Sequence, residues 1–508
     1  MALPALVTII LYLAALVCAS LLISRRSGGR NDFFRGGRKS PWGIVAVAMV
    51  STSISGVTFV SVPGMVEASQ FSYMQMALGF VAGYIAIAYI LLPLYYRLNL
   101  SSLYTYLGER FGEWSHRSGA AIFILAKTLS CSVRLYLTIS VLQLVVFAPL
   151  GIPFAVNLVA SIALTWLYTF KGGVRSTVWT DMIQTIFVVA TVVLCIVFIC
   201  REMDLDFKAA VSTVSHSPMS RVFFFDDPDD ARYFWKQFLA GAFTTIAMTG
   251  LDQDMMQKNL SCRNLCESRR NVLSYGVAFI PVNLIFLSLG VLLYRFADLH
   301  SVEFAVPDNL FPTIACGADP VSGLPYMPGY VGVLFVLGIV AAAFSSAGSA
   351  LTGLTTTFTI DILKADRISD SRRFFRTRTL IHSAGAVTIG AVILLLRSSG
   401  EGSVINLIYK VVSYTYGPLL GMFFFGIVSR RKVRDKAVPA ICVCSPLLSH
   451  LLATHSEAWF GGYQIGFELL IINAAITAVC LLLASIGKGK ADKVQCPGPD
   501  SNRHIFKG

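Results

Sequence analysis

The chain has 508 residues, of which 55% are hydrophobic and only 14% are charged, and its formal net charge is +13. Its mean hydropathy is +0.68. Soluble globular chains carry roughly a quarter charged residues, so this composition excludes a soluble enzyme. We therefore predict an all-α multi-pass membrane protein with little of the chain left for an aqueous domain.

Apolar runs long enough to cross a bilayer recur along the whole chain. They lie near residues 3–23, 41–66, 73–96, 118–148, 153–170, 176–200, 236–257, 271–297, 329–360, 379–396, 402–428, 437–455 and 464–487. These runs predict 13 transmembrane helices in a single transmembrane domain at residues 1–487. Residues 488–508 are rich in Gly, Lys and Asp and are predicted to form a disordered cytoplasmic tail.

The positions of the basic residues predict the orientation of these helices. Of the 41 Lys and Arg, 31 fall in the segments that follow odd-numbered helices. Because an excess of Lys and Arg marks cytoplasmic loops, we expect the amino terminus outside and the carboxyl terminus in the cytoplasm. Residues 1–23 have no basic residue before them and Arg25-Arg26 directly after, the reverse of a cleavable signal peptide. We therefore expect a protein of the plasma (inner) membrane, with the bilayer rather than a nucleic acid as its large partner.

Two predicted helices contain clusters of Gly, Ser, Thr and Pro that indicate a broken backbone. In helix 2 the cluster runs from Ser51 to Thr58 and is followed by Pro63-Gly64, and in helix 7 it runs from Gly241 to Asp252. Irregular backbone at membrane depth is tolerated where it lines a ligand cavity. The alternative is that these hydroxyls bond to their own helix.

The spacing of the two clusters, five helices apart, suits an inverted repeat. It would comprise helices 2–6 at residues 41–200 and helices 7–11 at residues 236–428, with helix 1 peripheral and helices 12–13 at residues 437–487. In such a fold the solute binds at the bilayer midplane, between the broken helices.

Helix 9 contains a run of small residues from Ala341 to Ser349. Small residues allow close helix packing, which alone would explain the run. However, the hydroxyls of Ser345 and Ser346 could join carbonyls freed in helix 2 to replace the hydration shell of a cation such as sodium.

Taken together, these segments resemble the sodium/solute symporter family, whose members share the leucine-transporter-type inverted-repeat fold. The resemblance spans nearly the whole chain. The residues that carry it are Gly36-Gly37-Arg38, Ser53-Ile54-Ser55-Gly56, Tyr168 to Gly173, Trp179-Thr180-Asp181, Asp252-Gln253 with Gln257, Ala342 to Ser346, and Tyr414 to Pro418.

This resemblance implies sodium as the coupling ion. The main sodium site would use the backbone carbonyls of Ser51, Ile54 and Ala342 and the hydroxyls of Ser345 and Ser346. Asp181 would serve a second sodium ion with Ser349, although Gly348 stands where two-sodium relatives often carry another hydroxyl.

Helix 4 carries two cations on one face, Lys127 and Arg134. An arginine can bind a carboxylate through two hydrogen bonds. In carboxylate-carrying relatives an arginine of this helix binds the solute, and Ser53, Ser55 and Thr58 match hydroxyl positions around it. The alternative is that Arg134 pairs with Asp181 or Asp252. Lys127 lies nearer the cytoplasmic end of the helix and is expected to extend towards the cytoplasmic surface.

Three positions disfavour a neutral sugar. Residues 71–96 contain no Asp or Glu, Lys410 replaces a glutamine of sugar-carrying relatives, and Met248 and Thr249 replace aromatic residues. Arg134 and Lys410 would instead suit an organic anion. The remaining candidates for the solute site are Tyr73, Gln75, Asp252 and Gln253.

We therefore predict a sodium-coupled symporter that imports a small organic solute, in particular a carboxylate, by alternating access. A symporter for sugars or other neutral solutes is the alternative. The acidic run Asp226 to Asp230 matches a diphosphate-binding pattern of membrane prenyltransferases, but it is predicted to lie outside without a second acidic motif. A channel is disfavoured because no ring-forming filter motif is present, so no enzymatic or channel activity is expected. The sequence leaves the oligomeric state open.

Overall fold

The computed structural model is almost entirely helical. It describes residues 2–25, 40–98, 100, 102–170, 173–319, 322–365, 368, 370–399, 404–459, 461, 463 and 465–485. Within these residues only isolated β-bridges accompany the helices. The motif at Gly36 to Arg38 and the predicted tail at 488–508 lie outside the described residues.

Helices occur in each of the apolar runs. In chain order they are α1 (Ala2–Arg25), α3 (Trp42–Ser53), α4 (Gly56–Gly64), α6 (Tyr73–Ala86), α7 (Leu92–Arg97), α9 (Glu113–Leu142), α10 (Phe154–Thr169), α11 (Gly173–Glu202), α13 (Phe234–Thr245), α14 (Gln253–Asn259), α15 (Leu265–His300), α17 (Gly329–Thr357), α18 (Ser371–Ser399), α19 (Val404–Val428), α20 (Val438–Trp459) and α21 (Leu469–Leu483). Shorter helices connect them, namely α5 (Val66–Ser69), α8 (Thr105–Arg110), α12 (Phe207–Ser215) and α16 (Leu310–Cys316).

Most of these helices can cross a membrane. Among the described residues, nine helices are long and apolar enough, and the bent pair α3 and α4 makes up to ten. Two apolar helices, α10 and α21, are shorter, and the predicted seventh span is divided between α13 and α14. The multi-pass architecture is confirmed, whereas the count of 13 spans and the repeat boundaries stay predictions.

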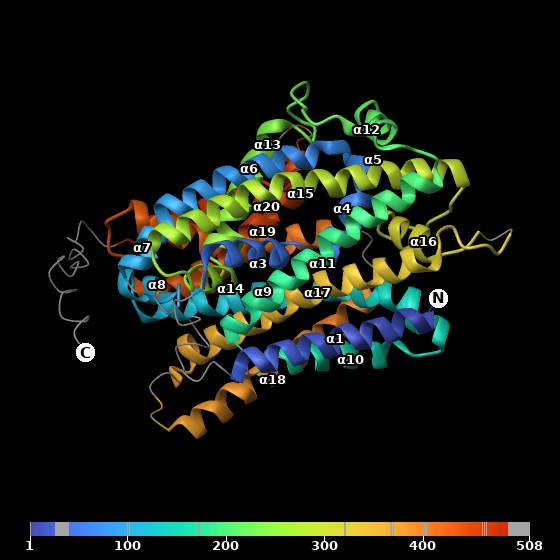
Figure 1. Ribbon diagram of the computed structural model, residues 1–508. Coiled ribbons are helices and arrows are strands. Elements are labelled where there is room, and N and C mark those ends of the chain that lie inside the picture. Colours follow the sequence, from blue (N-terminus) through green and yellow to red (C-terminus); the bar gives the residue numbers. More distant parts are fainter. Residues whose placement is uncertain are drawn as a thin grey trace.

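The helices lie side by side in an elongated bundle (Figure 1). Within it α6 packs along α13, α11 packs against both α3 and α17, and α19 packs against α9 and α21. Among the candidate spans in the described residues, α17 is the most enclosed. Of the residues in its most apolar stretch 83% are buried, compared with 22% for α18 and for α20. The run of small residues therefore belongs to the central helix of the bundle.

Glycines bring α6 and α13 into backbone contact. A Cβ atom at Gly79 would lie 2.1 Å from the carbonyl oxygen of Phe238, and one at Gly241 would lie 2.2 Å from that of Met76. Close approach of this kind is the usual role of small residues between membrane helices. It fixes the position of α13, and hence of the broken segment that follows it.

Candidate functional site

The predicted break in helix 2 lies between α3 and α4, whose axes differ by 59°. The amide of Ile54 still donates to the carbonyl of Val50 at 2.9 Å, and the next backbone bond of this kind joins Phe59 to Ser55 at 3.0 Å. A helix end leaves its last carbonyls without amide partners. The carbonyls from Ser51 to Ile54 are therefore available to another ligand.

The first turn of α4 is stabilised by its own side chains. The hydroxyl of Thr58 accepts a hydrogen bond from the amide of Ser55 at 3.4 Å, and the side chain of Ser55 caps the same turn. This reciprocal arrangement is a capping box. It starts α4 at a defined residue and leaves the end of α3 uncapped.

The predicted break in helix 7 is present as well. After α13 the chain continues as a π-helical segment, Ile246–Gly250, and α14 then begins at Gln253. The carboxylate of Asp252 caps α14 by accepting from the amide of Asp254 at 3.0 Å. Asp252 therefore stabilises the start of α14, directly after the break.

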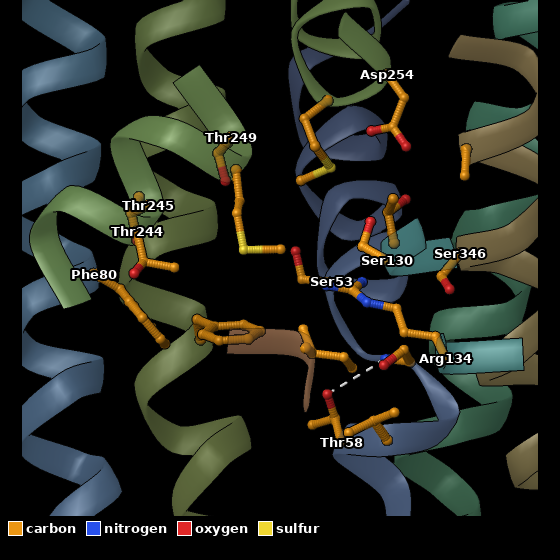
Figure 2. A pocket seen from close by; sticks show the side chains of 18 of the residues that line it. Ser53, Thr58, Phe80, Ser130, Arg134, Thr244, Thr245, Thr249, Asp254 and Ser346 are labelled. Carbon is orange, nitrogen blue, oxygen red and sulfur yellow. Dashed lines mark hydrogen bonds between the residues drawn. The ribbon is translucent and has the colours of Figure 1, made fainter. Parts of the chain in front are cut away.

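A cavity lies beside the two breaks, lined by hydroxyl-bearing and aromatic side chains. Among the residues discussed from the sequence, it is lined by Ser53, Ser55, Thr58, Tyr73, Lys127, Arg134, Met248, Thr249 and Ser346. Arg134 and Ser346 lie on one side of it, and Phe80, Thr244, Thr245 and Thr249 on the other (Figure 2). The cavity therefore has a basic side and a side rich in threonine hydroxyls.

Arg134 is the cation of this cavity that has no acidic partner within 4.0 Å among the described residues. Its Nε atom is buried without a hydrogen-bond partner in the described part of the chain. Its side chain reaches from α9 towards Ser53 (Figure 2). The alternative pairing with Asp181 or Asp252 is not formed, because each of these acids is bound to a lysine.

Lys127 does not extend to the surface as expected. Its Nζ atom lies 3.0 Å from a carboxylate oxygen of Asp252 and 2.6 Å from one of Asp254. The hydroxyl of Tyr416 also donates to Asp252, at 2.7 Å. Lys127 is held because two buried carboxylates at the start of α14 require a positive charge. This cluster is called the α14 cap cluster below.

Gln253 and Asp252 are absent from the cavity lining in the described structure. The Oε1 atom of Gln253 accepts from the amide of Leu103 at 3.0 Å, so this side chain connects α14 to the segment before α8. Both residues were predicted to bind solute. Their contacts assign them to the support of the break instead.

Gln75 and Lys410 also lie away from the cavity. Gln75 donates to the carbonyl of Arg232 at 2.8 Å and accepts from the amide of Phe224 at 3.1 Å, which fixes the loop before α13. Lys410 is exposed, whereas its neighbour Tyr409 lines the cavity. A step of one residue turns a helix by about 100°, so the rotation of α19 points the predicted cation outwards.

Several lining residues were not predicted. The hydroxyl of Tyr275 bonds to Ser53 and accepts from Tyr84 at 2.9 Å. Thr244 and Thr245 lie within the predicted small-residue cluster of helix 7, so their composition was a usable signal. No local pattern distinguishes Tyr275 or Tyr84 from other tyrosines of apolar helices.

The oxygens predicted to bind sodium lie on helices that pack together. Ser51 and Ile54 end α3, Ala342, Ser345 and Ser346 belong to α17, and α17 packs against both α3 and α4. The hydroxyl of Ser51 is buried without a hydrogen-bond partner in the described part of the chain. Neutral oxygens and freed carbonyls of this kind fit a sodium ion.

Asp181 was predicted to bind a second sodium ion with Ser349. The structure instead places the ammonium of Lys258 2.5 Å from an oxygen of Asp181 and 2.5 Å from the hydroxyl of Ser349. Ser345 donates to the other oxygen of Asp181 at 2.9 Å. This group is called the Asp181 cluster below.

His382 has the contacts of a packing residue. It is buried, and its ring nitrogens lie 2.9 Å from the hydroxyl of Thr169 and 2.7 Å from that of Thr355. Both of its hydrogen-bonding positions are occupied, and it does not line the cavity in the described structure.

Comparisons with a family model, with curated relatives and with solved structures all identify sodium-coupled symporters as similar proteins. Residues 33–442 match the model of the sodium:solute symporter family. The sodium/sialic acid symporter of Aliivibrio fischeri is 26% identical, over 92% of this chain and 91% of that protein. The human sodium/iodide cotransporter is 25% identical, over 95% of this chain and 74% of that protein.

Solved structures show the fold. The substrate-bound, outward-open state of a Na⁺-coupled sialic acid symporter superposes with a TM-score of 0.77 at 21% identity, covering 94% of this chain and 97% of that chain. A nucleobase-cation-symport-1 family transporter superposes with a TM-score of 0.53 over 89% of this chain and 93% of that chain. These likenesses confirm the expected leucine-transporter-type fold. The chain belongs to the sodium:solute symporter family and is a sodium-coupled membrane symporter, not an enzyme.

Proposed function

We propose that this symporter imports a small carboxylate-bearing solute together with sodium, and that Arg134 binds the carboxylate. The main observation behind this proposal is that Arg134 lines the cavity and that its Nε atom is buried without a hydrogen-bond partner among the described residues. A buried charge is costly unless it is paired. A solute carboxylate would supply that pair through two parallel hydrogen bonds.

The rest of the cavity suits a solute that is both hydroxylated and partly apolar. Thr244, Thr245 and Thr249 offer hydroxyls opposite Arg134, and Phe80 and Phe279 offer aromatic faces. Two relatives are named for sialic acid, a hydroxylated carboxylate, and others for iodide and monocarboxylates. These names support an anionic solute for this chain.

Sodium would bind between α3 and α17, at the carbonyls of Ser51, Ile54 and Ala342 and the hydroxyls of Ser345 and Ser346. Ser345 donates its hydroxyl hydrogen bond to Asp181, so the lone pairs of its oxygen remain free for a cation. An ion held there would tie the end of α3 to α17 and favour the solute-binding conformation. Coupling then follows from the higher solute affinity of that conformation.

We also propose that the protein lies in the plasma (inner) membrane with its amino terminus outside and its carboxyl terminus in the cytoplasm. The asymmetric distribution of Lys and Arg supports this orientation. The sodium gradient would drive uptake, and the membrane potential would add roughly 2.3 kcal/mol per 100 mV for each net charge that the transport cycle carries inwards. Rocking of the first two helices of each repeat against the third and fourth would open the cavity inwards.

The proposal is tested by thermal unfolding of the purified protein in sodium or potassium chloride. The ligands are sialic acid, simpler carboxylates, neutral sugars and amino acids, each acid being paired with its amide. A ligand present at 100 times its Kd stabilises the native state by about 2.7 kcal/mol. We expect stabilisation by an acid but not by its amide, only in sodium, and its loss in Arg134→Ala.

Lys410→Ala is the matched control, because Lys410 is exposed and outside the cavity. It should keep the stabilisation seen in the wild type. A neutral sugar that stabilises Arg134→Ala as well as the wild type would refute the carboxylate assignment. Stabilisation that does not depend on sodium would refute the ion site.

A further inference from the structure

Near the end of α14, a lysine ammonium is enclosed by oxygen atoms of three other helices. The side chain of Lys258 is 2% exposed, and that of its partner Asp181 is 1% exposed. Its Nζ atom lies 2.5 Å from Asp181 on α11 and 2.5 Å from Ser349 on α17, and it also donates to the hydroxyl of Thr52 on α3. One carboxylate and two hydroxyls form the kind of oxygen environment that a hard cation binds.

This ammonium adjoins the proposed sodium site. Ser345, one of the proposed sodium ligands, donates to one oxygen of Asp181, while Lys258 binds the other. Thr52 belongs to the last turn of α3, next to the freed carbonyls of Ser51 and Ile54. The Asp181 cluster and the sodium site thus share the end of α3 and one turn of α17.

We propose that Lys258 is a resident cation that takes the place of a second sodium ion beside Asp181, so that one sodium ion is coupled to each solute. The inference rests on the proposed sodium-coupled function. The charge of the cluster is already balanced, with one carboxylate and one ammonium. A sodium ion added there would be an uncompensated buried charge.

The space around the cluster is also filled. A Cβ atom at Gly348 would lie 1.9 Å from the hydroxyl oxygen of Tyr168, which itself donates to the carbonyl of Phe344. With Tyr168 in this position, there is no room at position 348 for a side chain that could add an oxygen ligand. The tyrosine closes the position from which another hydroxyl could reach an ion.

A tethered cation has a mechanistic consequence. Lys258 cannot leave when the sodium ion is released, so Asp181 stays neutralised in the ion-free carrier. The empty transporter can then return without an unpaired buried carboxylate. A monocarboxylate solute carried with one sodium ion would move no net charge.

The test counts sodium ions by isothermal titration calorimetry and by sodium-dependent thermal unfolding at constant ionic strength. Three proteins are compared: the wild type, Lys258→Ala, and Lys258→Ala combined with Asp181→Asn. We expect one ion, two ions and one ion, respectively. Because a Hill coefficient is limited by the number of sites, that of sodium binding should rise from about 1 to about 2 only in Lys258→Ala.

The double variant is the matched control, since it removes the lysine without leaving an unpaired carboxylate. If Lys258→Ala does not fold, the numbers of sodium ions bound by the wild type and by the double variant still test the inference. Two ions in the wild type, or an unchanged ion count and sodium affinity in Lys258→Ala, would overturn the inference even if uptake remains sodium-coupled. A wild type that binds no sodium would overturn the proposed function and this inference with it.

Discussion

The two broken helices satisfy their freed carbonyls in different ways. At the break between α13 and α14, Tyr95 donates to the carbonyl of Gly250 at 2.9 Å and Tyr104 donates to that of Leu251 at 3.0 Å. At the break between α3 and α4, the carbonyls from Ser51 to Ile54 receive no such bond from the described residues.

A broken helix therefore serves a different purpose in each of the two places. A freed carbonyl in a buried place must be bonded by something. The protein supplies tyrosines at the second break, which becomes a rigid support for α14. At the first break we infer that the partner of the carbonyls is a sodium ion, so that sodium binding stabilises this break.

The largest effect is expected from the α14 cap cluster. Lys127→Met would leave Asp252 and Asp254 buried without their cation, and breaking a buried pair costs about 3–5 kcal/mol. Thermal unfolding in potassium chloride should show this loss without any sodium present. The control is Lys364→Met, whose partner Glu113 is 45% exposed, so that a loss of at most about 1 kcal/mol is expected.

An equal loss in the two variants would mean that the second break does not depend on buried charge. A selective loss in Lys127→Met would identify the cap cluster as the element that holds α14. Sodium binding by the residual folded protein should keep its wild-type stoichiometry, because the proposed ion site lies at the other break.

A smaller effect is expected for Tyr104→Phe. The variant removes the donor to the carbonyl of Leu251 while keeping the ring, and an unsatisfied buried carbonyl costs about 1–3 kcal/mol. We expect a lower Tm in sodium and in potassium alike. A loss of Tm confined to sodium would show that the second break, too, responds to the ion.

Ser345→Ala tests the first break through its sodium affinity. Because a hydrogen bond or ligand to a charged group contributes about 1.5–3 kcal/mol, sodium affinity should fall by roughly tenfold or more. The Tm in potassium should also fall, because the variant loses the hydrogen bond from Ser345 to the buried carboxylate of Asp181. Isothermal titration with sodium chloride measures the affinity directly.

Thr352→Ala on the same helix is the control for that experiment. The hydroxyl of Thr352 donates to the carbonyl of Gly348, within its own helix, at 2.9 Å. It should bind sodium like the wild type. Equal sodium affinities in the two variants would remove Ser345 from the proposed ion site and leave the carbonyls of the first break without an assigned partner.

The sequence by itself determined the apolar helices and the two breaks, and it singled out Arg134, which lines the cavity. These features depend on local composition, because helix continuity and membrane insertion are set within about one span. The resemblance to sodium/solute symporters likewise rests on short segments such as Ser53 to Gly56. Local chemistry was sufficient for each of these predictions.

Only the tertiary structure decided which charges are paired and which side chains face the cavity. Lys127 meets Asp252 across 125 residues, and Lys258 meets Asp181 across 77. Lys410 and Gln75 were assigned by position, but the rotation of α19 and the fold of the loop before α13 turned them elsewhere. Ion pairs and the direction in which a side chain points depend on helix packing. Packing brings together residues that are far apart in the chain, and their separation in the sequence does not predict their distance in space.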